Sequence, residues 1–282
     1  MALPPVSIIV PTLNEEKYIG SLLASLAAQT NRNFEVVVVD GQSQDKTVWV
    51  ASQFKKLLPR LSILKAPQSS VSLQRNIGAQ KSLFELLLFL DADVILDPTF
   101  IDLALGEFQR KKADLATSSS IFINGNSVDY LTSKIMNASI DLTKGFYPLS
   151  YGSTIFAKKE FHQKIGGFDQ NMKFYEDSDY CQRAAKAGAH FELLKSSFPY
   201  TSARRFVHNG RLRTYWTGVA FAIDTLLYGK DEAQKRVSFK PVNSLTKLKR
   251  EIRQATLSRR FKRLNRNLKA ALLELQEELK SL

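Results

Sequence analysis

The sequence predicts a doubly wound α/β fold, in which a mostly parallel sheet carries helices on both faces. The first observation is that short apolar runs rich in β-branched residues alternate with stretches of helical periodicity. The second is that these runs are continuously apolar, which is typical of strands buried on both faces of a parallel sheet. The third is that three of the runs finish in polar residues, PTLNEE, DGQSQD and DAD, at the strand ends where such sheets bind ligands.

The N-terminal part of the chain contains alternating strands and helices. The first helix is indicated by apolar residues that recur at spacings of three and four. In chain order we expect the strand Val6–Val10, a helix near Glu15–Gln29, the strand Phe34–Val39, a helix near Lys46–Leu58, the strand Leu61–Lys65, a helix near Val71–Leu83 and the strand Leu86–Leu90.

Beyond residue 112 the pattern is looser, and we expect the acceptor side of an enzyme to be built there. The apolar runs and helical spacings indicate a strand at Leu115–Ile123, a helix near Val128–Leu142, a strand at Ser153–Ala157, a turn at Gly166–Gly167, a helix near Asp177–Ala187 and a strand near His190–Leu194.

Length and composition indicate a globular protein. The chain has 282 residues, of which 44% are hydrophobic, enough to fill a sizeable core. Prolines at positions 4, 5 and 11 leave too short an apolar stretch for a signal peptide, and no run reaches the length of a membrane span. Cys181 is the single cysteine, which excludes an internal disulfide, argues against a cysteine-based metal cluster and fits a reducing cytoplasm.

The positive charge is concentrated at the C-terminal end. Residues 235–282 contain 14 Lys and Arg against 4 Asp and Glu, so they carry +10 of the total charge of +13. From Leu245 onward, apolar residues recur at helical spacing. We therefore expect a body at residues 1–230, divided near residue 112 into two halves, and a basic helical extension at 231–282.

Two uses of this amphipathic extension are open. Its basic face suits docking to an anionic membrane surface, which would place the protein in the cytoplasm at the inner face of the membrane. Its leucines equally suit packing on the body or pairing with a second helix, so an oligomer is the alternative.

Two carboxylates stand at the end of the apolar run Leu86–Leu90, in the tripeptide Asp91–Ala92–Asp93. Carboxylates at this spacing can address one hard cation, and Mg²⁺ or Mn²⁺ is commonly held between one or two carboxylates and the phosphates of a substrate. The alternative is a turn in which both aspartates cap the following helix.

The other two strand ends carry candidate binding residues. Asp40 could accept a hydrogen bond from a nucleobase N–H, or could form a turn or helix cap. Pro11, Leu13 and Glu15 could form a rigid wall with one carboxylate directed inward, although Glu15 also suits the first turn of a helix. Asp45 is expected to cap the helix that follows it.

As a set, six segments resemble the inverting family 2 glycosyltransferases, which have the GT-A fold. The segments are PTLNEE (11–16), VVVVDGQSQDKT (36–47), QRNIGA (74–79), LDADV (90–94), GGFD (166–169) and EDSDYCQRAAKAG (176–188). The resemblance covers about residues 6–215, and it implies a nucleotide-sugar half at about 1–112 and an acceptor half at about 113–230. DGQSQD replaces the commoner DDGSxD of the family, and QRN replaces ARN. These departures bear on the preference for the nucleotide base more than on the reaction.

The resemblance implies a role for each matching donor-site residue. Pro11, Leu13, Glu15 and Asp40 would line the nucleoside pocket, with Asp40 on the base. Arg75 of QRN would lie near the nucleotide. Asp91, Ala92 and Asp93 would form the DXD element that holds the metal, Mn²⁺ or Mg²⁺, and the sugar nucleotide, with Asp93 the more direct ligand.

Inverting transfer to a hydroxyl requires a general base, and the segment FYEDSDY supplies candidates. Family resemblance nominates Glu176 and Asp177, and we favour Asp177 as the base with Glu176 binding acceptor or sugar. Clustered carboxylates raise the pKa of one of them, although a helix N-terminus opposes this. The alternative is that Asp177 and Asp179 only cap the helix.

Three further candidates follow in TSARRFVHNGRLR. Arg204 and Arg205 could clamp the diphosphate, because guanidinium matches phosphate oxygens bidentately, or could form a solvated basic loop. His208 is a candidate third metal ligand, although a lone histidine is more often structural or exposed.

The sequence thus predicts a metal-dependent inverting glycosyltransferase that uses a nucleotide diphosphate sugar, with UDP favoured, and a glycan or lipid-linked hydroxyl acceptor in glycan, cell-envelope or glycolipid synthesis. Sugar transfer to a polyprenyl phosphate is the alternative within the enzyme class. A nucleic-acid-binding protein and a non-catalytic glycosyltransferase-like scaffold are the alternatives outside it. The basic tail has one aromatic residue, Phe261, and no recognised nucleic-acid module, so no specific nucleic-acid partner is expected.

Overall fold

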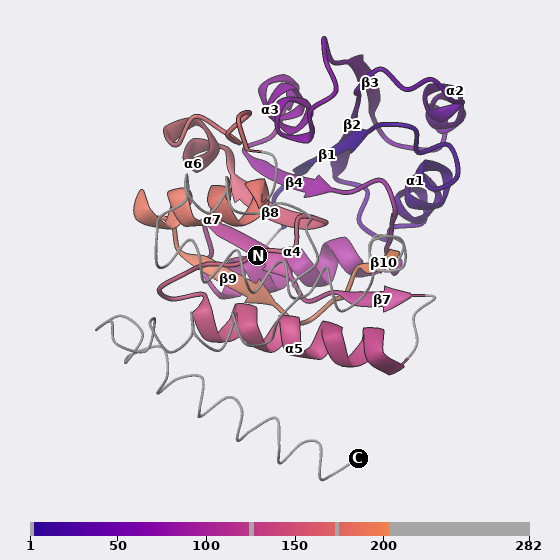
Figure 1. Cartoon of the computed structure of the whole chain (residues 1–282). Coiled ribbons are helices and arrows are strands. Elements are labelled where there is room, and N and C mark those ends of the chain that lie inside the picture. Colours follow the sequence, from indigo (N-terminus) through magenta and orange to yellow (C-terminus); the bar gives the residue numbers. More distant parts are fainter. Residues whose placement is uncertain (1–2, 124–126, 173–174, 203–282) are drawn as a thin grey trace, which may run out of the picture. The chain divides into compact units, whose positions relative to one another are not determined.

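A computed structural model describes residues 3–123, 127–172 and 175–202 of the chain (Figure 1). These residues form the mixed α/β architecture that the sequence predicts. The expected boundary at residue 230 and the basic helical extension lie outside the described residues. Within the described ranges, no helix is both long enough and apolar enough to cross a membrane.

The main sheet of the described part has seven strands in the order β3-β2-β1-β4-β8-β6-β9. Neighbouring strands are parallel except at β8, which runs antiparallel to both β4 and β6. The strands are β1 (Val6–Thr12), β2 (Phe34–Asp40), β3 (Leu61–Lys65), β4 (Leu86–Leu90), β6 (Leu115–Ser118), β8 (Thr154–Lys158) and β9 (Phe191–Leu194). The expected mostly parallel sheet is thereby confirmed.

A second sheet of three strands has the order β5-β10-β7, with β5 at Val94–Ile95, β7 at Ile121–Ile123 and β10 at Tyr200–Ser202. The single strand expected at Leu115–Ile123 is therefore two strands, β6 and β7, that belong to different sheets. The chain changes sheet within the serine run between them: Ser119 N–H still donates to Leu194 O of β9 (2.8 Å), whereas Ile121 N–H donates to Pro199 O next to β10 (3.2 Å).

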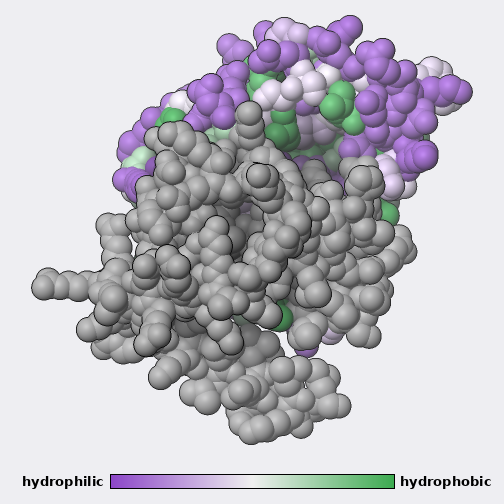
Figure 2. All heavy atoms as spheres, in the orientation of Figure 1, coloured by the Kyte–Doolittle hydropathy of each residue, from purple (hydrophilic) through white to green (hydrophobic). Residues whose placement is uncertain are grey.

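Helices cover both faces of the main sheet (Figure 1). One core cluster joins α1 and α4 to β1, β2 and β4, and the other joins α3 and α7 to the opposite face of β1 and β4. The helices are α1 (Ile19–Ala27), α2 (Thr47–Ser52), α3 (Val71–Lys81), α4 (Phe100–Arg110), α5 (Ser127–Thr143), α6 (Lys159–Lys164) and α7 (Glu176–Lys186). In the view of Figure 2, the described residues that are visible are mostly hydrophilic, with smaller hydrophobic areas.

The helix α4 is missing from the elements expected from the sequence. It buries Phe100, Ile101, Ala104, Leu105 and Phe108 against the sheet, at the helical spacing of three and four. The signal was therefore present in the sequence, immediately after Asp97 and Pro98, which form the turn that leads into the helix.

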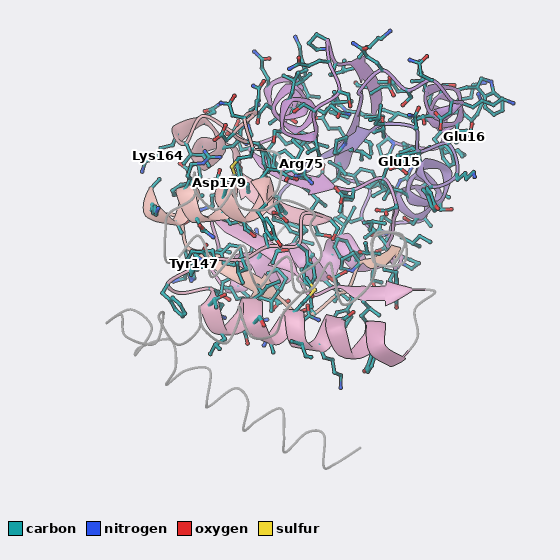
Figure 3. The ribbon with its side chains drawn as sticks, in the orientation of Figure 1. Glu15, Glu16, Arg75, Tyr147, Lys164 and Asp179 are labelled. Atoms are coloured by element: carbon teal, nitrogen blue, oxygen red, sulfur yellow. The ribbon has the colours of Figure 1, made fainter. Side chains whose placement is uncertain are left out.

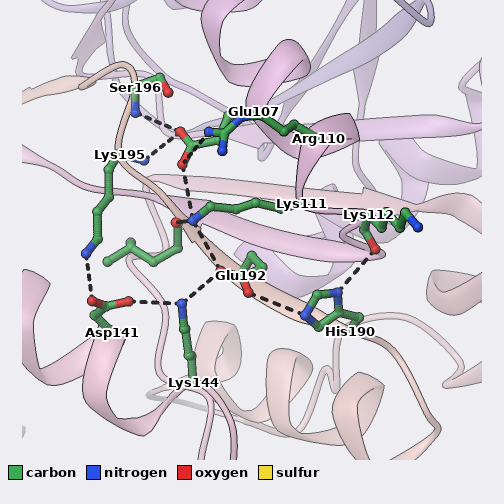
Figure 4. A network of polar contacts seen from close by, with 11 residues as sticks. Glu107, Arg110, Lys111, Lys112, Asp141, Lys144, His190, Glu192, Lys195 and Ser196 are labelled. Atoms are coloured by element: carbon green, nitrogen blue, oxygen red, sulfur yellow. Dashed lines mark hydrogen bonds and ion pairs between the residues drawn. The ribbon is translucent and has the colours of Figure 1, made fainter.

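Charged residues join α4 and α5 to β9 in one network (Figure 4). Lys111 Nζ lies 3.1 Å from Glu107 and 3.2 Å from Glu192, and Lys144 Nζ lies 2.9 Å from Glu192. Burial opposes ionisation of Glu107, but hydrogen bonds from Ser196 and Lys195 prevail and lower its pKa. The network fixes the helices that flank β9 without taking part in the candidate site.

Close packing of α3 on β1 depends on Gly78. A methyl group at this position would overlap Cγ2 of Ile9, a fully buried residue at the centre of β1. This approach of helix to sheet positions the N-terminal turns of α3, which carry the QRN segment.

We expect Gly78→Ala to lower the free energy of unfolding by about 1–3 kcal/mol, because the added methyl overpacks the α3–β1 contact. Gly106→Ala is the matched control: this glycine is also helical, but a methyl there meets no atom within 4 Å, so the change should be neutral or stabilising by up to about 1 kcal/mol. Urea unfolding midpoints measure both effects. Equal midpoints for the two variants would contradict the proposed packing constraint.

Candidate active site

The expected strand ends meet at one edge of the main sheet. Thr12 at the end of β1 pairs in register with Asp40 at the end of β2, and β4, which ends at Leu90, adjoins β1 on its other side. The parallel strands thus bring three polar segments together, as the sequence predicts.

Asp40 offers one unsatisfied oxygen at this edge. Its side chain is buried, and Oδ2 accepts hydrogen bonds from the N–H groups of Gln42 (3.1 Å) and Ser43 (3.1 Å). Oδ1 is buried without a hydrogen-bond partner among the described residues. A buried acceptor without a partner is costly, so Asp40 suits a ligand that brings an N–H donor.

The segment after β1 lies beside Asp40. Pro11 is buried within β1, Leu13 is exposed, and Glu15 is partly buried, with its N–H donating to Thr47 Oγ1 at 2.7 Å. Asp45 Oδ1 accepts from Thr47 N–H (2.9 Å) at the start of α2, but the N-cap position is Lys46 and no side chain caps the helix there, so the expected N-cap role of Asp45 is wrong.

Arg75 is the central cation of the site. Its side chain is 2% exposed, and its Nη2 lies 3.0 Å from Asp91 Oδ1 and 2.8 Å from Gly152 O, while Nη1 lies 3.2 Å from Glu176 Oε1. The guanidinium carbon lies 5.1 Å from the centre of the Phe168 ring. Figure 3 shows Arg75 between α3 and α7. Arg75 therefore links the carboxylate after β4 to the carboxylate that begins α7.

The Asp91–Ala92–Asp93 segment forms a turn rather than a helix cap. Asp91 N–H donates to Ser153 O (3.2 Å), and Val94 N–H donates back to Asp91 O (3.3 Å) before the short strand β5. Asp93 and Ala92 are buried, whereas the Asp91 side chain is 13% exposed. The capping alternative for these aspartates is therefore not supported by the structure.

Glu176 and Asp177 begin α7. The preceding residue, Tyr175, has left-handed backbone angles and makes no side-chain cap. Asp179 lies inside the helix and pairs with Arg183 (2.8 Å). Asp177 Oδ1 accepts from the adjacent Ser178 N–H (2.7 Å), a local contact that is not an N-cap. Capping alone does not account for these carboxylates.

The surroundings of Asp177 favour its protonated form. Burial of the carboxyl is the largest cause that raises its pKa to about 7, and the negative charge of Glu176 is the second. Arg75 opposes the shift without cancelling it. A carboxyl with a pKa near neutrality suits the task of a general base.

Gly152 allows the backbone to approach these groups. A methyl group at this position would lie 3.0 Å from Asp177 Oδ2 and 3.5 Å from Arg75 Nη2. The glycine thus leaves room for Asp177 while its carbonyl accepts from Arg75. No motif in the sequence pointed to this residue, because its partners are distant in the chain.

The two neighbours of Arg75 also hold the site together, and they are missing from the residues expected from the sequence. Gln74 Nε2 donates to Thr12 O and Val39 O, both at 2.7 Å, and so ties β1 to β2 beside Asp40. Asn76 binds both the N–H and the carbonyl of Phe168, each at 2.8 Å. The unusual Gln of QRN was the available signal for Gln74.

The chemistry of this edge fits a divalent cation shared with a substrate. The described residues contain no cluster of three or more His, Cys, Asp or Glu that could enclose a metal. Two neighbouring carboxylates, Asp91 and Asp93, suit a site whose remaining ligands are phosphate oxygens and water. Arg204, Arg205 and His208 lie outside the described residues.

Comparison with known proteins identifies relatives of the chain. The family model described as glycosyl transferase family 2 matches residues 7–181. The poly(ribitol-phosphate) beta-N-acetylglucosaminyltransferase TarS of Staphylococcus aureus strain MW2 is 27% identical over 208 residues, which are 71% of this chain but 35% of TarS. An uncharacterized glycosyltransferase of Haemophilus influenzae is 28% identical over 222 residues, which are 77% of this chain and 74% of that protein.

Solved structures of similar fold confirm the expected GT-A architecture. The crystal structure of S. aureus TarS 1–349 in complex with UDP-GlcNAc has a TM-score of 0.57 and 25% identity, and covers 70% of this chain and 58% of that one. The mannosyltransferase PcManGT from Pyrobaculum calidifontis, in complex with GDP-Man and Mn²⁺, has a TM-score of 0.64 and 17% identity, and covers 97% and 87% of the two chains.

We expect Arg75→Met to lower the free energy of unfolding by about 3 kcal/mol, because it leaves two partly buried carboxylates without their cation. Arg110→Met is the control, since the Arg110 side chain is 69% exposed and lies 3.9 Å from Glu107. The control should change stability by about 0.5 kcal/mol or less. Urea unfolding measures both, and a loss for Arg75→Met no larger than the control's would contradict the central role of this ion pair.

Proposed function

The chain belongs to glycosyl transferase family 2, and we propose that it is a metal-dependent, inverting enzyme that moves a sugar from a nucleotide diphosphate sugar to an acceptor hydroxyl. The observation that carries this proposal is the position of Asp177, a carboxyl with a pKa of about 7, next to Glu176. Arg75 links Glu176 (3.2 Å) to Asp91 (3.0 Å) through two ion pairs. A candidate base is thus held beside the candidate donor site. Synthesis of a glycan, cell-envelope component or glycolipid is the setting we propose.

Asp40 is the proposed contact for the nucleotide base. Its buried Oδ1 lacks a partner within the described residues, and a nucleobase N–H would satisfy it. Pro11, Leu13 and Glu15 are proposed as the wall of the nucleoside pocket. A UDP-type donor is favoured because TarS, the relative that is 25% identical in its solved structure, is described in complex with UDP-GlcNAc.

Asp93 and Asp91 are proposed to hold the divalent cation, Mn²⁺ or Mg²⁺. Asp93 is proposed as the more direct ligand, and Asp91, whose Oδ1 lies 3.0 Å from Arg75, is proposed to lie closer to the nucleotide ribose or to a water on the metal. When bound, the cation would offset the negative charge of the diphosphate leaving group. Arg204 and Arg205 are proposed to bind the same diphosphate, and His208 is proposed as a third ligand.

Asp177 is the proposed general base, and Glu176 is proposed to bind acceptor or sugar. Above pH 7 the Asp177 carboxyl is mostly ionised and can accept the proton of the attacking hydroxyl. The proximity of Glu176 keeps the carboxyl basic enough for this task, while Arg75 holds Glu176 in place. Inversion follows if the acceptor attacks from the face opposite the leaving diphosphate.

A polyprenyl phosphate acceptor is the second candidate within the enzyme class. An already ionised phosphate oxygen needs no base, so the raised pKa of Asp177 favours the hydroxyl acceptor instead. We propose that the protein acts in the cytoplasm, at the inner face of the membrane when the acceptor is lipid-linked. Pairing through the C-terminal helix is proposed for any oligomer.

We expect Asp93→Ala to abolish Mn²⁺-dependent release of nucleotide from a panel of UDP- and GDP-sugars, because the cation loses its more direct ligand. Asp102→Ala is the control, since Asp102 lies on α4, where its side chain accepts hydrogen bonds from Thr30 and Asn31. Thermal unfolding without metal checks that both variants fold. Unchanged metal-dependent release in folded Asp93→Ala would overturn the metal assignment.

We expect Asp177→Asn to reduce kcat by about 10²–10⁴-fold with a hydroxyl acceptor. In the parent enzyme kcat/KM should fall as pH decreases through about 7, where Asp177 takes up a proton. Glu160→Gln, an exposed residue of α6, is the control and should keep the parent's rate and pH profile. Activity that survives in Asp177→Asn would exclude the general-base role and favour the phosphate acceptor.

A stability measurement distinguishes an Asp177→Asn variant that has lost its fold from one that has lost only the base. Because the folded-state pKa of Asp177 is raised from 3.8 to about 7, the parent loses stability as pH rises through that interval. Asp177→Asn removes this loss, so the variant should unfold at a higher urea concentration than the parent at pH 8. A variant less stable than the parent at pH 8 would contradict the raised pKa.

A further inference from the structure

The segment 46–60 exposes large apolar side chains at the edge of the nucleotide-sugar half. Val48 is 41% exposed, Trp49 is 62% exposed and Leu57 is 56% exposed. Val48 and Trp49 lie on α2, which Figure 1 shows at the periphery beside α1, and Leu57 lies in the turns that follow α2. Single exposed apolar residues need no explanation, but three in one short segment indicate a surface that contacts another body.

All the charged residues of the same segment are cations, although the carboxylates of Glu16 and Asp45 accept hydrogen bonds from its first two backbone N–H groups. Lys46, Lys55, Lys56 and Arg60 are all exposed, and residues 46–60 contain no Asp or Glu, so the segment carries +4. The preceding residues 1–45 contain two Lys and Arg against five Asp and Glu, a charge of −3. The positive charge is therefore specific to this segment rather than a property of the whole N-terminal half.

Buried residues and a backbone hydrogen bond hold the segment 46–60 in one conformation. Thr47, Ala51 and Leu58 are buried and anchor the segment to the core. Arg32 Nη2 donates to Leu57 O (2.6 Å), which fixes the backbone at the far end of the segment. The exposed side chains are thus presented by an ordered backbone, so little conformational entropy is lost when they bind.

We propose that residues 46–60 form a docking surface for an anionic phospholipid membrane, with Trp49 and Leu57 entering the interface and the four cations on the lipid phosphates. Tryptophan prefers the boundary between headgroups and acyl chains, and each lysine or arginine near an anionic surface adds favourable energy. A second copy of the chain fits less well, because two identical surfaces of charge +4 repel each other.

Docking through this surface would bring the donor site close to the bilayer. Glu15 N–H donates to Thr47 Oγ1 (2.7 Å), and Lys46 N–H donates to Glu16 Oε2 (3.0 Å), so α2 begins directly beside the segment that follows β1. A sugar transferred at that edge would reach an acceptor anchored in the membrane. The docking itself does not depend on the proposed sugar transfer and is tested without substrate.

The test follows Trp49 directly in the full chain. The chain contains two tryptophans, so Trp216→Phe leaves Trp49 as the only one. With phosphatidylcholine vesicles that contain about one third phosphatidylglycerol, a composition that provides a negative surface, we expect sedimentation with the vesicles. Trp49 fluorescence should shift to shorter wavelength and should be quenched by brominated acyl chains. Pure phosphatidylcholine vesicles should bind much more weakly.

Charge reversal compares this surface with exposed lysines elsewhere on the described part of the chain. Lys55→Glu/Lys56→Glu should weaken vesicle binding about tenfold or more, given the contribution of each lysine near an anionic surface. Lys81→Glu/Lys186→Glu is the matched control, with the same change in net charge at exposed positions of α3 and α7. All four lysines are exposed, so the variants should keep the unfolding midpoint of the parent.

Four outcomes would overturn the proposal. The first is vesicle binding without any change in Trp49 fluorescence, which would assign the docking to another part of the chain. The second is an equal loss of binding in both double variants. The third is a fluorescence shift that follows protein concentration without lipid, which would indicate self-association. The fourth is the absence of binding to anionic vesicles.

Discussion

The candidate site depends on one buried cation, the guanidinium of Arg75. A buried charge is costly unless it is paired, and Arg75 is paired with Asp91 at 3.0 Å, Glu176 at 3.2 Å and the carbonyl of Gly152 at 2.8 Å. These partners come from the turn after β4, the start of α7 and the loop before β8. One side chain therefore fixes the distance between the proposed donor-binding carboxylates and the proposed base.

Three consecutive residues of α3 each bind a different part of the site. Gln74 ties the ends of β1 and β2, Arg75 joins the two pairs of carboxylates, and Asn76 holds the backbone at Phe168. Successive helical residues point about 100° apart, so a single turn of helix reaches three different segments. Gly78 allows this turn to approach the sheet closely. The scaffold and the site are thus coupled through the packing of one helix.

The pKa of Asp177 is the result of competing effects of different size. Burial and the charge of Glu176 raise its pKa, while Arg75 and the Ser178 N–H lower it, and the balance is a value of about 7. Arg75 forms its ion pairs with Asp91 and Glu176 rather than with Asp177. Among the described residues, Arg75 thus pairs with Glu176 and not with Asp177, so Glu176 serves as an anchor while Asp177 titrates near neutrality.

The sequence by itself determined the order of strands and helices from β1 to β4, the mostly parallel sheet, and the convergence of the strand ends that carry Asp40, Asp91 and Asp93 on one edge. It could do so because local periodicity identifies buried strands and parallel strands place their carboxyl ends together. It also contained the helical spacing of apolar residues in α4, a helix absent from the elements we expected. It did not reveal that β6 and β7 are separate strands. Only the tertiary structure decided the partners of Arg75, the need for Gly152 and the burial that is the largest cause of the raised pKa of Asp177. These depend on contacts between residues as far apart as 75 and 176, and neither local propensity nor spacing along the chain contains that information.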